Sequence, residues 1–515
     1  MTREIAATQE ARRGAFSSRL VFIFAAIGSA VGLGNIWRFP YVAYDNGGGA
    51  FILPYLVALL TAGIPFLYLD YAVGHRNRGS APLSFARMHA RAEFIGWWQT
   101  GICAVIAVYY AAIIGWSLRY MFLSVDKGWG ADPAQFFTGQ FLQMADPALG
   151  VTLDFVPGIV VPLIVIWVAV IAIMALGVQK GVGATSVIFI PVLVVAFVIL
   201  VVQALLLPGA IDGLDALFTP NWSALGDTAV WAAAFGQIFF SLSIGFGIMI
   251  TYASYAGRRT DMTGSGLVVG FANSGFELLC GIGVFAALGF MAQAAGVEVS
   301  EVVASGIGLA FVAFPTIISE APAGAFLGVL FFASLILAGI TSLVSILEVV
   351  ISAIRDKFEM TRIGATMVVS LPLAVVSITL FGTTSTLTVL DIMDNFINKF
   401  GILLVAVVSM LVVAWVLRGL PTLASHLNAY GSIPVKGWWT LLIAFFVPIV
   451  LGFVLAQELR DTLAKTYGGY PEWMVAVFGW GIAAAVIVVG ALVTMVRWRP
   501  DTPMEIPAAS LEAQP

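Results

Sequence analysis

Two short stretches of this chain hold residue types that could bind a small ion and a small polar molecule. The first is "GSAVGLGNIWRFP" at residues 28–40, where three glycines fall within seven residues ahead of Asn35 and Arg38. The second is "SLSIGFG" at residues 241–247. A helix broken by Gly and Ser leaves backbone carbonyl and amide groups without helical partners. Free oxygens suit a hard cation, and free amide groups at a helix N-terminus suit a carboxylate.

The elements that carry these stretches are predicted to be membrane-spanning helices. Hydrophobic residues make up 60% of the 515 residues, charged residues make up 10%, and the mean hydropathy is +1.01, which soluble globular proteins do not reach. Apolar runs long enough to cross roughly 30 Å of hydrocarbon occur twelve times, at about 18–43, 50–74, 94–123, 157–177, 184–207, 230–257, 264–293, 323–354, 363–383, 388–417, 437–457 and 473–496. The predicted fold class is an all-α membrane protein with twelve transmembrane helices.

The basic residues predict the orientation of the spans. Most of the 24 Lys and Arg residues fall in the N-terminal segment and in the alternate loops on its side of the membrane, which the positive-inside rule makes cytoplasmic. We therefore expect a cell (plasma) membrane protein with both termini in the cytoplasm, an N-terminal segment over 1–17 and a disordered tail over 497–515. No signal-peptide cleavage site is predicted, and Cys103 and Cys280 both fall inside spans, where they resemble small core residues.

The two interrupted spans occupy matched places, because each begins a group of five spans. Paired broken helices with polar residues in mid-membrane are typical of alternating-access transporters, where unwound backbone lines a polar cavity. Glycines in membrane helices more often serve close helix packing, and either stretch taken alone is compatible with that alternative. Two such stretches at matched positions, each flanked by polar side chains, favour a transport site.

Three longer motifs resemble the neurotransmitter:sodium symporter family, and in particular its bacterial amino-acid branch. They are "WRFPYVAYDNGGGAF" at 37–51, "GQIFFSLSIGFG" at 236–247 and "AGITSLVSILE" at 338–348, and the resemblance runs collinearly over nearly the whole chain. It implies a 5+5 inverted repeat of leucine-transporter type with unwound helices 1 and 6. The transporter core would cover 18–417, with repeats at about 18–207 and 230–417, followed by helices 11 and 12 over 437–496.

The resemblance also implies two sodium sites built from oxygen ligands. Sodium site 1 would combine the substrate carboxylate with residues of both breaks and of span 7, namely Ala30, Asn35, Ser241 and Asn273. Sodium site 2 would use carbonyls and hydroxyls of spans 1 and 8, namely Gly28, Val31, Ala338, Thr341 and Ser342. Taken alone, Thr341 and Ser342 are more often ordinary helix hydroxyls that bond back to a carbonyl of their own helix, and it is the joint occurrence of all these groups that favours a sodium site.

By the same resemblance, the substrate pocket lies between the two breaks and spans 3 and 8. Its lining would be Ser29, Ala30, Leu33, Gly34, Ile106, Tyr110, Phe240, Ser241, Ser243, Phe246, Ser342 and Ile346. Relatives that carry monoamines place an Asp where Gly32 stands, so a glycine implies a substrate that brings its own carboxylate. Ile106, Phe246 and Ile346 would surround the other end with apolar surface, and we therefore expect a neutral, hydrophobic amino acid.

Charged residues inside spans are expensive and are candidates for function. The resemblance assigns two gates, each a pair of opposite charges: Arg38 with Asp394 outside, and Arg13 with Asp356 inside, beside Phe16. As alternatives, Arg38 could extend to the outer membrane surface and Arg13 could be an ordinary positive-inside charge. Lys399, five residues after Asp394, leaves open a competing partner for that carboxylate.

Glu277 in "NSGFELL" is a carboxylate in mid-span, which is costly unless it is paired or protonated. The resemblance implies that chloride-dependent relatives carry a serine here and hold chloride near the counterparts of Tyr55, Gln237, Ser241 and Asn273. A carboxylate would replace that anion, so we expect no chloride requirement, with a proton on Glu277 as a candidate counter-cargo. Two further intramembrane acids, Asp70 and Glu348, are expected to hydrogen-bond the backbone of the unwound segments.

The expected function is sodium-coupled symport of an amino acid across the lipid bilayer. Alternatives are a symporter of the same fold for an aromatic amino acid or a compatible solute, and a membrane receptor that does not transport. The sequence has no repeated filter motif of a channel, no catalytic cluster and no Walker motif, and "GLGN" at 32–35 lacks the third glycine of a nucleotide-binding motif. We expect no nucleotide and no nucleic-acid partner, and the oligomeric state is open between monomer and homodimer.

Overall fold

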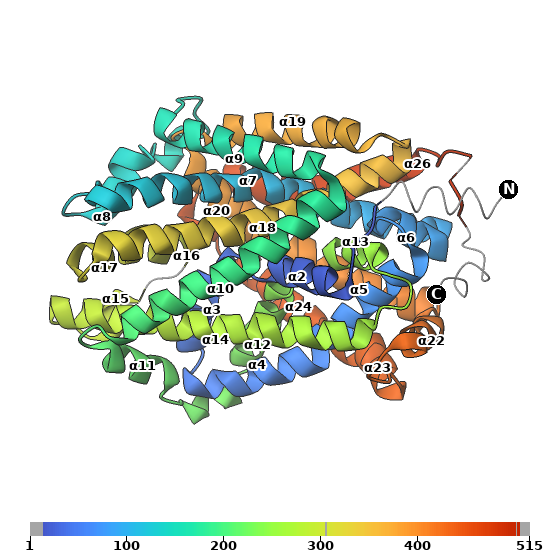
Figure 1. The fold of residues 1–515 in the computed structure, drawn as a ribbon, viewed down its shortest axis with the longest axis horizontal. Coiled ribbons are helices and arrows are strands. Elements are labelled where there is room, and N and C mark those ends of the chain that lie inside the picture. The colour runs from blue at the N-terminus through green and yellow to red at the C-terminus, as the bar shows by residue number, and fades with distance from the viewer. Residues whose placement is uncertain (1–13, 304–305, 501, 505–515) are drawn as a thin grey trace.

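The described part of the chain is a bundle of long helices that run side by side, as the computed structural model shows (Figure 1). The structure describes residues 14–303, 306–500 and 502–504. Ten helices within these ranges are long and apolar enough to cross a membrane: Gly49–Asn77, Ala90–Asp126, Pro157–Ala175, Val178–Leu205, Met262–Ala295, Gly324–Phe358, Arg362–Phe381, Thr386–Val416, Gly437–Gly469 and Glu472–Met495.

Two further apolar segments are interrupted at the predicted places. Helices α2 (Arg19–Ala30) and α3 (Leu33–Asp45) meet at an angle of 56° and together are long enough to form one broken span. Helices α12 (Thr228–Ser241) and α13 (Ile248–Tyr255) are separated by residues 242–247. At about 1.5 Å per residue neither of the latter two is long enough to cross a membrane alone. The total of twelve spans and the inverted repeat stay predictions.

Several spans are continuous across a turn of π-helix, so one span can carry two labels. The principal helices of the ten spans are α4 (Ile52–Ala58) with α5 (Ile64–Asn77), α7 (Glu93–Asp126), α9 (Pro157–Ala175), α10 (Ala184–Leu205), α14 (Met262–Ala295), α18 (Gly324–Phe358), α19 (Arg362–Phe381), α20 (Thr386–Phe396) with α21 (Leu403–Leu411), α23 (Gly437–Leu441) with α24 (Val447–Ala464), and α25 (Glu472–Met474) with α26 (Ile482–Met495).

Short helices cover the two ends of the bundle. One end, which we call the α6 end, carries α6 (Ala81–Met88) and α22 (Leu420–Tyr430) at the right of Figure 1. The opposite end, the α17 end, carries α8 (Pro133–Gln135), α11 (Ala210–Phe218), α15 (Val299–Val302), α16 (Gly306–Gly308) and α17 (Phe314–Glu320). The loops therefore alternate between two faces, as a series of membrane crossings requires.

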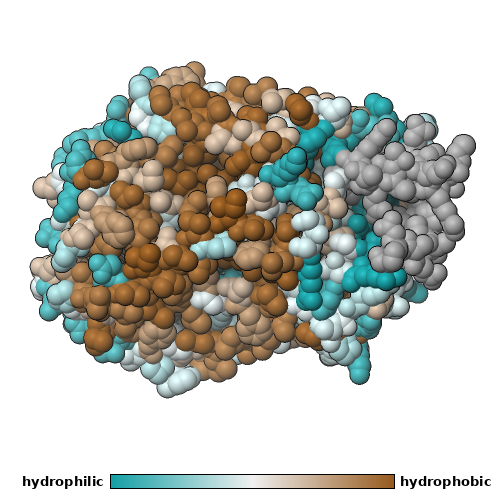
Figure 2. Space-filling model, in the orientation of Figure 1, coloured by the Kyte–Doolittle hydropathy of each residue, from teal (hydrophilic) through white to brown (hydrophobic). Residues whose placement is uncertain are grey.

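A broad apolar belt separates the two ends (Figure 2). Large aliphatic side chains on α9, α10, α19 and α26 are more than half exposed, among them Val168, Val195, Val375 and Val489. Helices with apolar residues on all faces suit a hydrocarbon environment, where exposed Val and Leu carry no penalty. Figure 2 thus shows the surface that the composition predicts for a protein embedded in a bilayer.

The centre of the bundle is built on α7 and α18, which pack against each other more extensively than any other two described helices. The broken span α2–α3 and the segment α12–α13 lie beside this pair, because α18 contacts α2 and α13, and α3 contacts α12. The two breaks are therefore held against two long, continuous helices.

The beginning of the predicted tail lies against the α6 end. The indole N–H of Trp498 donates to Glu93 Oε2 at 2.7 Å, and Lys357 Nζ lies 2.6 Å from Glu93 Oε1 and 4.3 Å from the centre of the Trp498 ring. The Arg87 side chain donates to the carbonyl oxygen of Pro503 at 3.0 Å. This part of the chain is therefore attached through an ion pair whose two side chains are almost entirely buried.

Candidate functional site

The break in the first span exposes the amide groups that begin α3. Residues 31 and 32 have extended backbone, and the helix restarts at Leu33. The Gly32 amide donates to Asn35 Oδ1 at 2.8 Å, and the Leu33 amide donates to the hydroxyl of Tyr110 on α7 at 3.2 Å. Both amides thus lie within reach of polar side chains at a helix N-terminus, the kind of place that favours a carboxylate.

Gly32 and Gly34 stand where the backbone approaches other side chains closely. A Cβ added at Gly32 would lie 3.0 Å from Ser342 Oγ and 3.1 Å from the Tyr110 hydroxyl oxygen. A Cβ added at Gly34 would overlap the ring of Phe240. The backbone of α3 is therefore in close contact with side chains of α7, α12 and α18 at these two positions.

The break between α12 and α13 depends on backbone in the left-handed region. Gly245 and Gly247 have φ of 86° and 88°, and Ser243 has φ of 52°, which is uncommon for a residue with a side chain. The Ser243 hydroxyl donates to the carbonyl oxygen of Ser29 at 2.8 Å, and the Ser342 hydroxyl lies 3.4 Å from the same oxygen. One carbonyl of the first break thus joins both breaks to α18.

The residues predicted for sodium site 1 come together around Asn35. Its amide nitrogen donates to Asn273 Oδ1 at 2.8 Å and to Ser241 Oγ at 3.3 Å, and the Asn273 amide donates to Ser241 Oγ at 2.5 Å. Ala30 is buried at the end of α2, five residues before Asn35. Three of the four predicted residues are therefore in mutual contact, although Asn35 is more than 200 residues from the other two. Their side chains carry oxygen atoms of the kind that a hard cation prefers.

The residues predicted for sodium site 2 are less convergent. The Thr341 hydroxyl donates to carbonyl oxygens of its own helix, at 3.0 Å for Ala338 and 3.1 Å for Leu337, which is the alternative that the sequence left open. A Cβ added at Gly28 would lie 3.4 Å from Ser186 Oγ on α10, a polar neighbour that the sequence did not identify. Val31 and Ser342 are both buried close to this region. Sodium site 2 stays a prediction.

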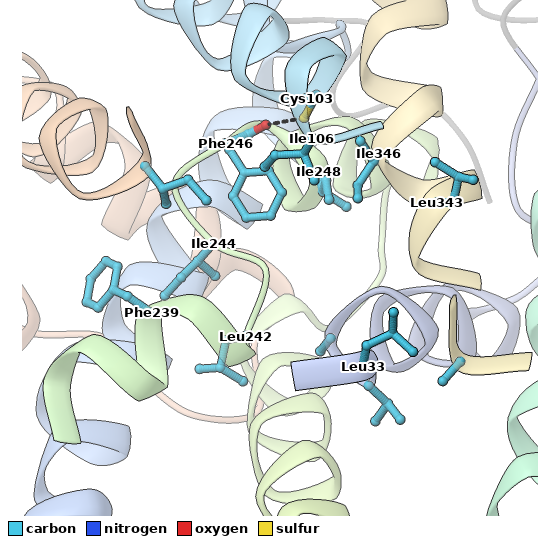
Figure 3. Packing of buried hydrophobic residues seen from close by; sticks show 14 of the residues in the cluster. Leu33, Cys103, Ile106, Phe239, Leu242, Ile244, Phe246, Ile248, Leu343 and Ile346 are labelled. Carbon is cyan, nitrogen blue, oxygen red and sulfur yellow. Dashed lines mark hydrogen bonds between the residues drawn. The ribbon is translucent and has the colours of Figure 1, made fainter. Parts of the chain in front are cut away.

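The predicted side-chain end of the pocket is apolar. Figure 3 shows Ile106, Phe246 and Ile346 gathered on one side, with Leu33 facing them from the end of the first break. All four side chains are buried. Phe240 is partly buried, and the Arg38 guanidinium stacks over its ring at 4.3 Å from the centroid. The Arg38 side chain thus packs on a residue predicted to line the pocket.

The proposed outer gate residues, Arg38 and Asp394, do not form a direct ion pair. Among the described residues, no carboxylate oxygen lies within 4.0 Å of the Arg38 guanidinium nitrogens. The Asp394 carboxylate instead accepts a hydrogen bond from the Asn398 amide at 2.7 Å. Lys399 does not compete for Asp394, because its Nζ lies 2.7 Å from Glu458 on α24.

The predicted inner gate can be followed only in part, since Arg13 lies outside the described residues. Asp356 Oδ2 accepts the amide N–H of Ser80, which precedes α6, at 2.9 Å. Phe16 is buried at the same end, where its ring contacts Tyr252 and Tyr255 edge-on at 5.6 and 5.9 Å. The gate assignment for Arg13 and Asp356 stays a prediction.

Glu277 is fully buried in α14 and is surrounded by the predicted polar residues. The Tyr55 hydroxyl donates to its Oε2, and the Gln237 amide donates to Oε1 at 2.7 Å. Glu277 follows Asn273 by four residues on α14, so both side chains lie on one face of that helix.

The two other acids in the spans differ in their partners. Asp70 Oδ2 accepts the amide N–H of Gly245 in the second break at 3.2 Å, as expected for a residue that holds the unwound backbone. The expectation for Glu348 is wrong, because its carboxylate pairs with Arg362 at 2.7 Å and accepts the Tyr255 hydroxyl proton at 2.7 Å. An arginine at the start of α19 satisfies this carboxylate, so it takes no backbone partner in the breaks.

Two functional candidates on α7 were missed. Gln99 Nε2 donates to the carbonyl oxygen of Gly245 at 3.0 Å, and Cys103 Sγ donates to that of Phe246 at 3.1 Å (Figure 3). Both precede Ile106 and Tyr110 at helical spacing, so one face of α7 carries all four. That spacing was visible in the sequence, but Cys103 was interpreted as a core residue.

Comparison with known proteins agrees with this geometry. A family model described as the Sodium:neurotransmitter symporter family matches residues 13–131 and 130–500. An uncharacterised sodium-dependent transporter of Methanocaldococcus jannaschii is 40% identical over 94% of this chain and 98% of that protein. The sodium-dependent serotonin transporter of Drosophila melanogaster is 30% identical over 93% of this chain and 82% of its own length. The sodium- and chloride-dependent glycine transporter 2 of Xenopus laevis is 28% identical over 92% and 68%, respectively. The chain therefore belongs to the sodium:neurotransmitter symporter family, whose members are sodium-coupled transporters.

Proposed function

We propose that this protein is a sodium-coupled symporter that imports a neutral, hydrophobic amino acid by alternating access. The observation that carries the proposal is Gly32, whose amide begins α3 beside the Tyr110 hydroxyl and whose close approach to Ser342 and Tyr110 leaves little space for a side chain, so that a carboxylate at this place would come from the substrate. A carboxylate bound there would lie near the Asn35, Ser241 and Asn273 cluster and could complete the ligands of a sodium ion. Substrate and ion would then stabilise each other's binding.

The apolar residues Ile106, Phe246 and Ile346 support a hydrophobic side chain on the substrate, because burial of a charged group against them would be costly. The relatives differ in the cargo that their names state, which includes glycine and serotonin. An aromatic amino acid or a compatible solute is the second candidate for this chain, and the partial exposure of Phe240 is the observation that favours a larger substrate.

The experiment is scintillation-proximity binding to the purified protein, with sodium or potassium as the only cation and with the full amino-acid panel as competitors. We expect binding that requires sodium and that neutral apolar amino acids displace. Equal competition by glutamate or lysine would contradict the apolar pocket, and the absence of any competitor would refute the amino-acid assignment.

We also propose that transport needs no chloride. Relatives such as glycine transporter 2 and the taurine transporter of Rattus norvegicus are named as chloride-dependent. Here the buried carboxylate of Glu277 already supplies a negative charge to Tyr55 and Gln237. We further propose that the protein binds two sodium ions and that Arg38–Asp394 and Arg13–Asp356 form its outer and inner gates. We also propose that it lies in the plasma membrane with both termini in the cytoplasm.

A further inference from the structure

The break between α12 and α13 leaves backbone groups that need partners from other helices. An N–H or C=O group without a hydrogen-bond partner inside a membrane protein costs about several kcal/mol, because the hydrocarbon offers it no partner. Side chains of neighbouring helices supply three of these partners. Asp70 accepts the Gly245 N–H at 3.2 Å, Gln99 donates to the Gly245 carbonyl at 3.0 Å, and Cys103 donates to the Phe246 carbonyl at 3.1 Å.

These contacts fix the backbone on both sides of Phe246. Gly245 and Gly247, which flank it, have φ of 86° and 88°, and glycine by itself restricts such backbone little. The carbonyls of two consecutive residues, 245 and 246, are held by donors four residues apart on α7. The orientation of both peptide planes next to Phe246, and so the direction of its ring, therefore depends on Gln99 and Cys103.

The same face of α7 also contacts the first break. Gln99, Cys103, Ile106 and Tyr110 lie at i, i+4, i+7 and i+11, so all four project from one side of the helix. Tyr110 receives the Leu33 amide proton at one end of this face, about 16 Å from Gln99 along the helix. Ile106 lies between the two anchoring points, beside Phe246 and Ile346 in Figure 3. One rigid helix thus sets the separation of the two breaks.

We propose that Gln99 and Cys103 are positioning residues that determine the size of side chain that the substrate pocket accepts. Neither residue needs to touch the substrate. They act by holding the carbonyls of Gly245 and Phe246, so that the Phe246 ring and Ile106 define the apolar end of the pocket. The proposal rests on the proposed amino-acid site, and it assigns the selectivity of that site to hydrogen bonds that lie behind the pocket wall.

The chain offers a matched control because it contains two cysteines. Cys103 and Cys280 are both fully buried in long helices, α7 and α14. Cys103 donates a hydrogen bond to a carbonyl, whereas no acceptor for Cys280 is found in the part of the chain that the structure describes. Replacing either cysteine by alanine therefore removes the same volume, but only the replacement of Cys103 removes a hydrogen bond.

The test compares wild type with Cys103→Ala, Cys103→Ser, Gln99→Leu and Cys280→Ala in sodium-dependent binding of alanine and of leucine. We expect Cys103→Ala and Gln99→Leu to lower the affinity for leucine relative to alanine about five- to tenfold, since an unpaired buried carbonyl lets the Phe246 backbone move. Cys103→Ser retains a donor and should stay within about threefold of wild type, and Cys280→Ala should leave the ratio unchanged.

The proposal is overturned if Cys103→Ala changes the ratio of leucine to alanine affinity by less than twofold. It is also overturned if Cys103→Ser or Cys280→Ala changes this ratio as much as Cys103→Ala does. Failure of wild type to bind any amino acid refutes the proposed function instead, and the two results are therefore distinguishable. Infrared spectra of the S–H stretch add a readout that is independent of substrate, because a thiol that donates a hydrogen bond absorbs at lower frequency. Cys103→Ala should remove the lower-frequency band and Cys280→Ala the higher one, and the reverse assignment, or bands at one frequency, also overturns the proposal.

Discussion

Replacing Glu277 by serine should make transport depend on chloride. The substitution removes a fully buried carboxylate that receives hydrogen bonds from Tyr55 and Gln237. A serine hydroxyl is too short to reach the same donors, so an anion-sized space bordered by two donors remains. Because Glu277 follows Asn273 by one turn of α14, disorder of these donors would reach the residues predicted for sodium site 1.

The size of the effect follows from the number of donors left without an acceptor. A buried donor without a partner costs about 1–3 kcal/mol, so two donors weaken the assembled site by about 2 kcal/mol even at the lower limit. Every 1.4 kcal/mol is about a tenfold change, and we therefore expect sodium-dependent binding in Glu277→Ser to fall at least about thirtyfold when chloride is absent. Chloride that binds among the same donors should restore most of this loss.

The assay is uptake of the bound amino acid into proteoliposomes in sodium chloride and in sodium gluconate. Wild type should transport equally in both media, and Glu277→Ser should transport only in chloride. Glu277→Gln is the matched control, because an amide of the same shape occupies the space and should give no chloride response. A large decrease of wild-type uptake in gluconate, or a well-folded Glu277→Ser protein that is indifferent to chloride, would refute this reasoning.

Three further changes test other parts of the structure. Gly32→Asp would place a carboxylate beside Ser342 and Tyr110, and like-charge repulsion should lower amino-acid binding at least about a hundredfold in the same binding assay, without loss of folded protein in size-exclusion chromatography. Trp498→Ala should lower the melting temperature by a few degrees, because Glu93 loses the indole N–H donor and Lys357 loses the ring beside it, contacts worth about 1–2 kcal/mol together. Trp498→Phe keeps a ring but no donor, so its melting temperature should lie between those of wild type and Trp498→Ala. Burial opposes ionisation of Asp261, but hydrogen bonds from Gly264 and Ser432 and the charge of Arg19 hold the pKa of its carboxyl below the ordinary value. A carboxyl whose pKa is lowered in the folded protein stabilises the fold at pH values above its unfolded-state pKa of about 3.9. This stabilisation is lost as the pH falls below that value and through the folded-state pKa. Asp261→Asn should therefore melt below wild type at pH 7, and acidification below about pH 4 should narrow the difference; a constant difference would contradict the role of this charge.

The breaks, and the polar residues Asn35 and Ser241 next to them, could be predicted because their signals are local and chemically specific. Glycines in the middle of an apolar run are unusual enough to mark both interruptions, and Asn35 and Ser241 lie within or beside them. The contact of these residues with Asn273 on α14 required the family resemblance, because it joins positions 238 residues apart. Composition alone predicts membrane helices and does not predict which of them meet.

The partners of charged residues were harder to predict. Lys399 follows Asp394 closely in sequence, but it lies in a turn of π-helix over Ile397–Ile402 and pairs with Glu458 on α24. Glu348 pairs with Arg362, which is only 14 residues away but lies on the next helix after a reversal of the chain. Such choices depend on where helices cross, and no local pattern in the sequence contains that information.

Coupling between ion and substrate can be explained by contacts that the two breaks share. The Ser29 carbonyl accepts the Ser243 hydroxyl and lies near that of Ser342, so the first break, the second break and α18 meet at one oxygen. On α7, Tyr110 holds the first break while Gln99 and Cys103 hold the second. Ordering one break therefore orients groups that belong to the other. A sodium ion that fixes Asn35 would reduce the entropy that a substrate must lose when Phe246 and Leu33 close around it, and the substrate would do the same for the ion. This reciprocity needs no distant pathway, because both breaks are attached to the same two helices.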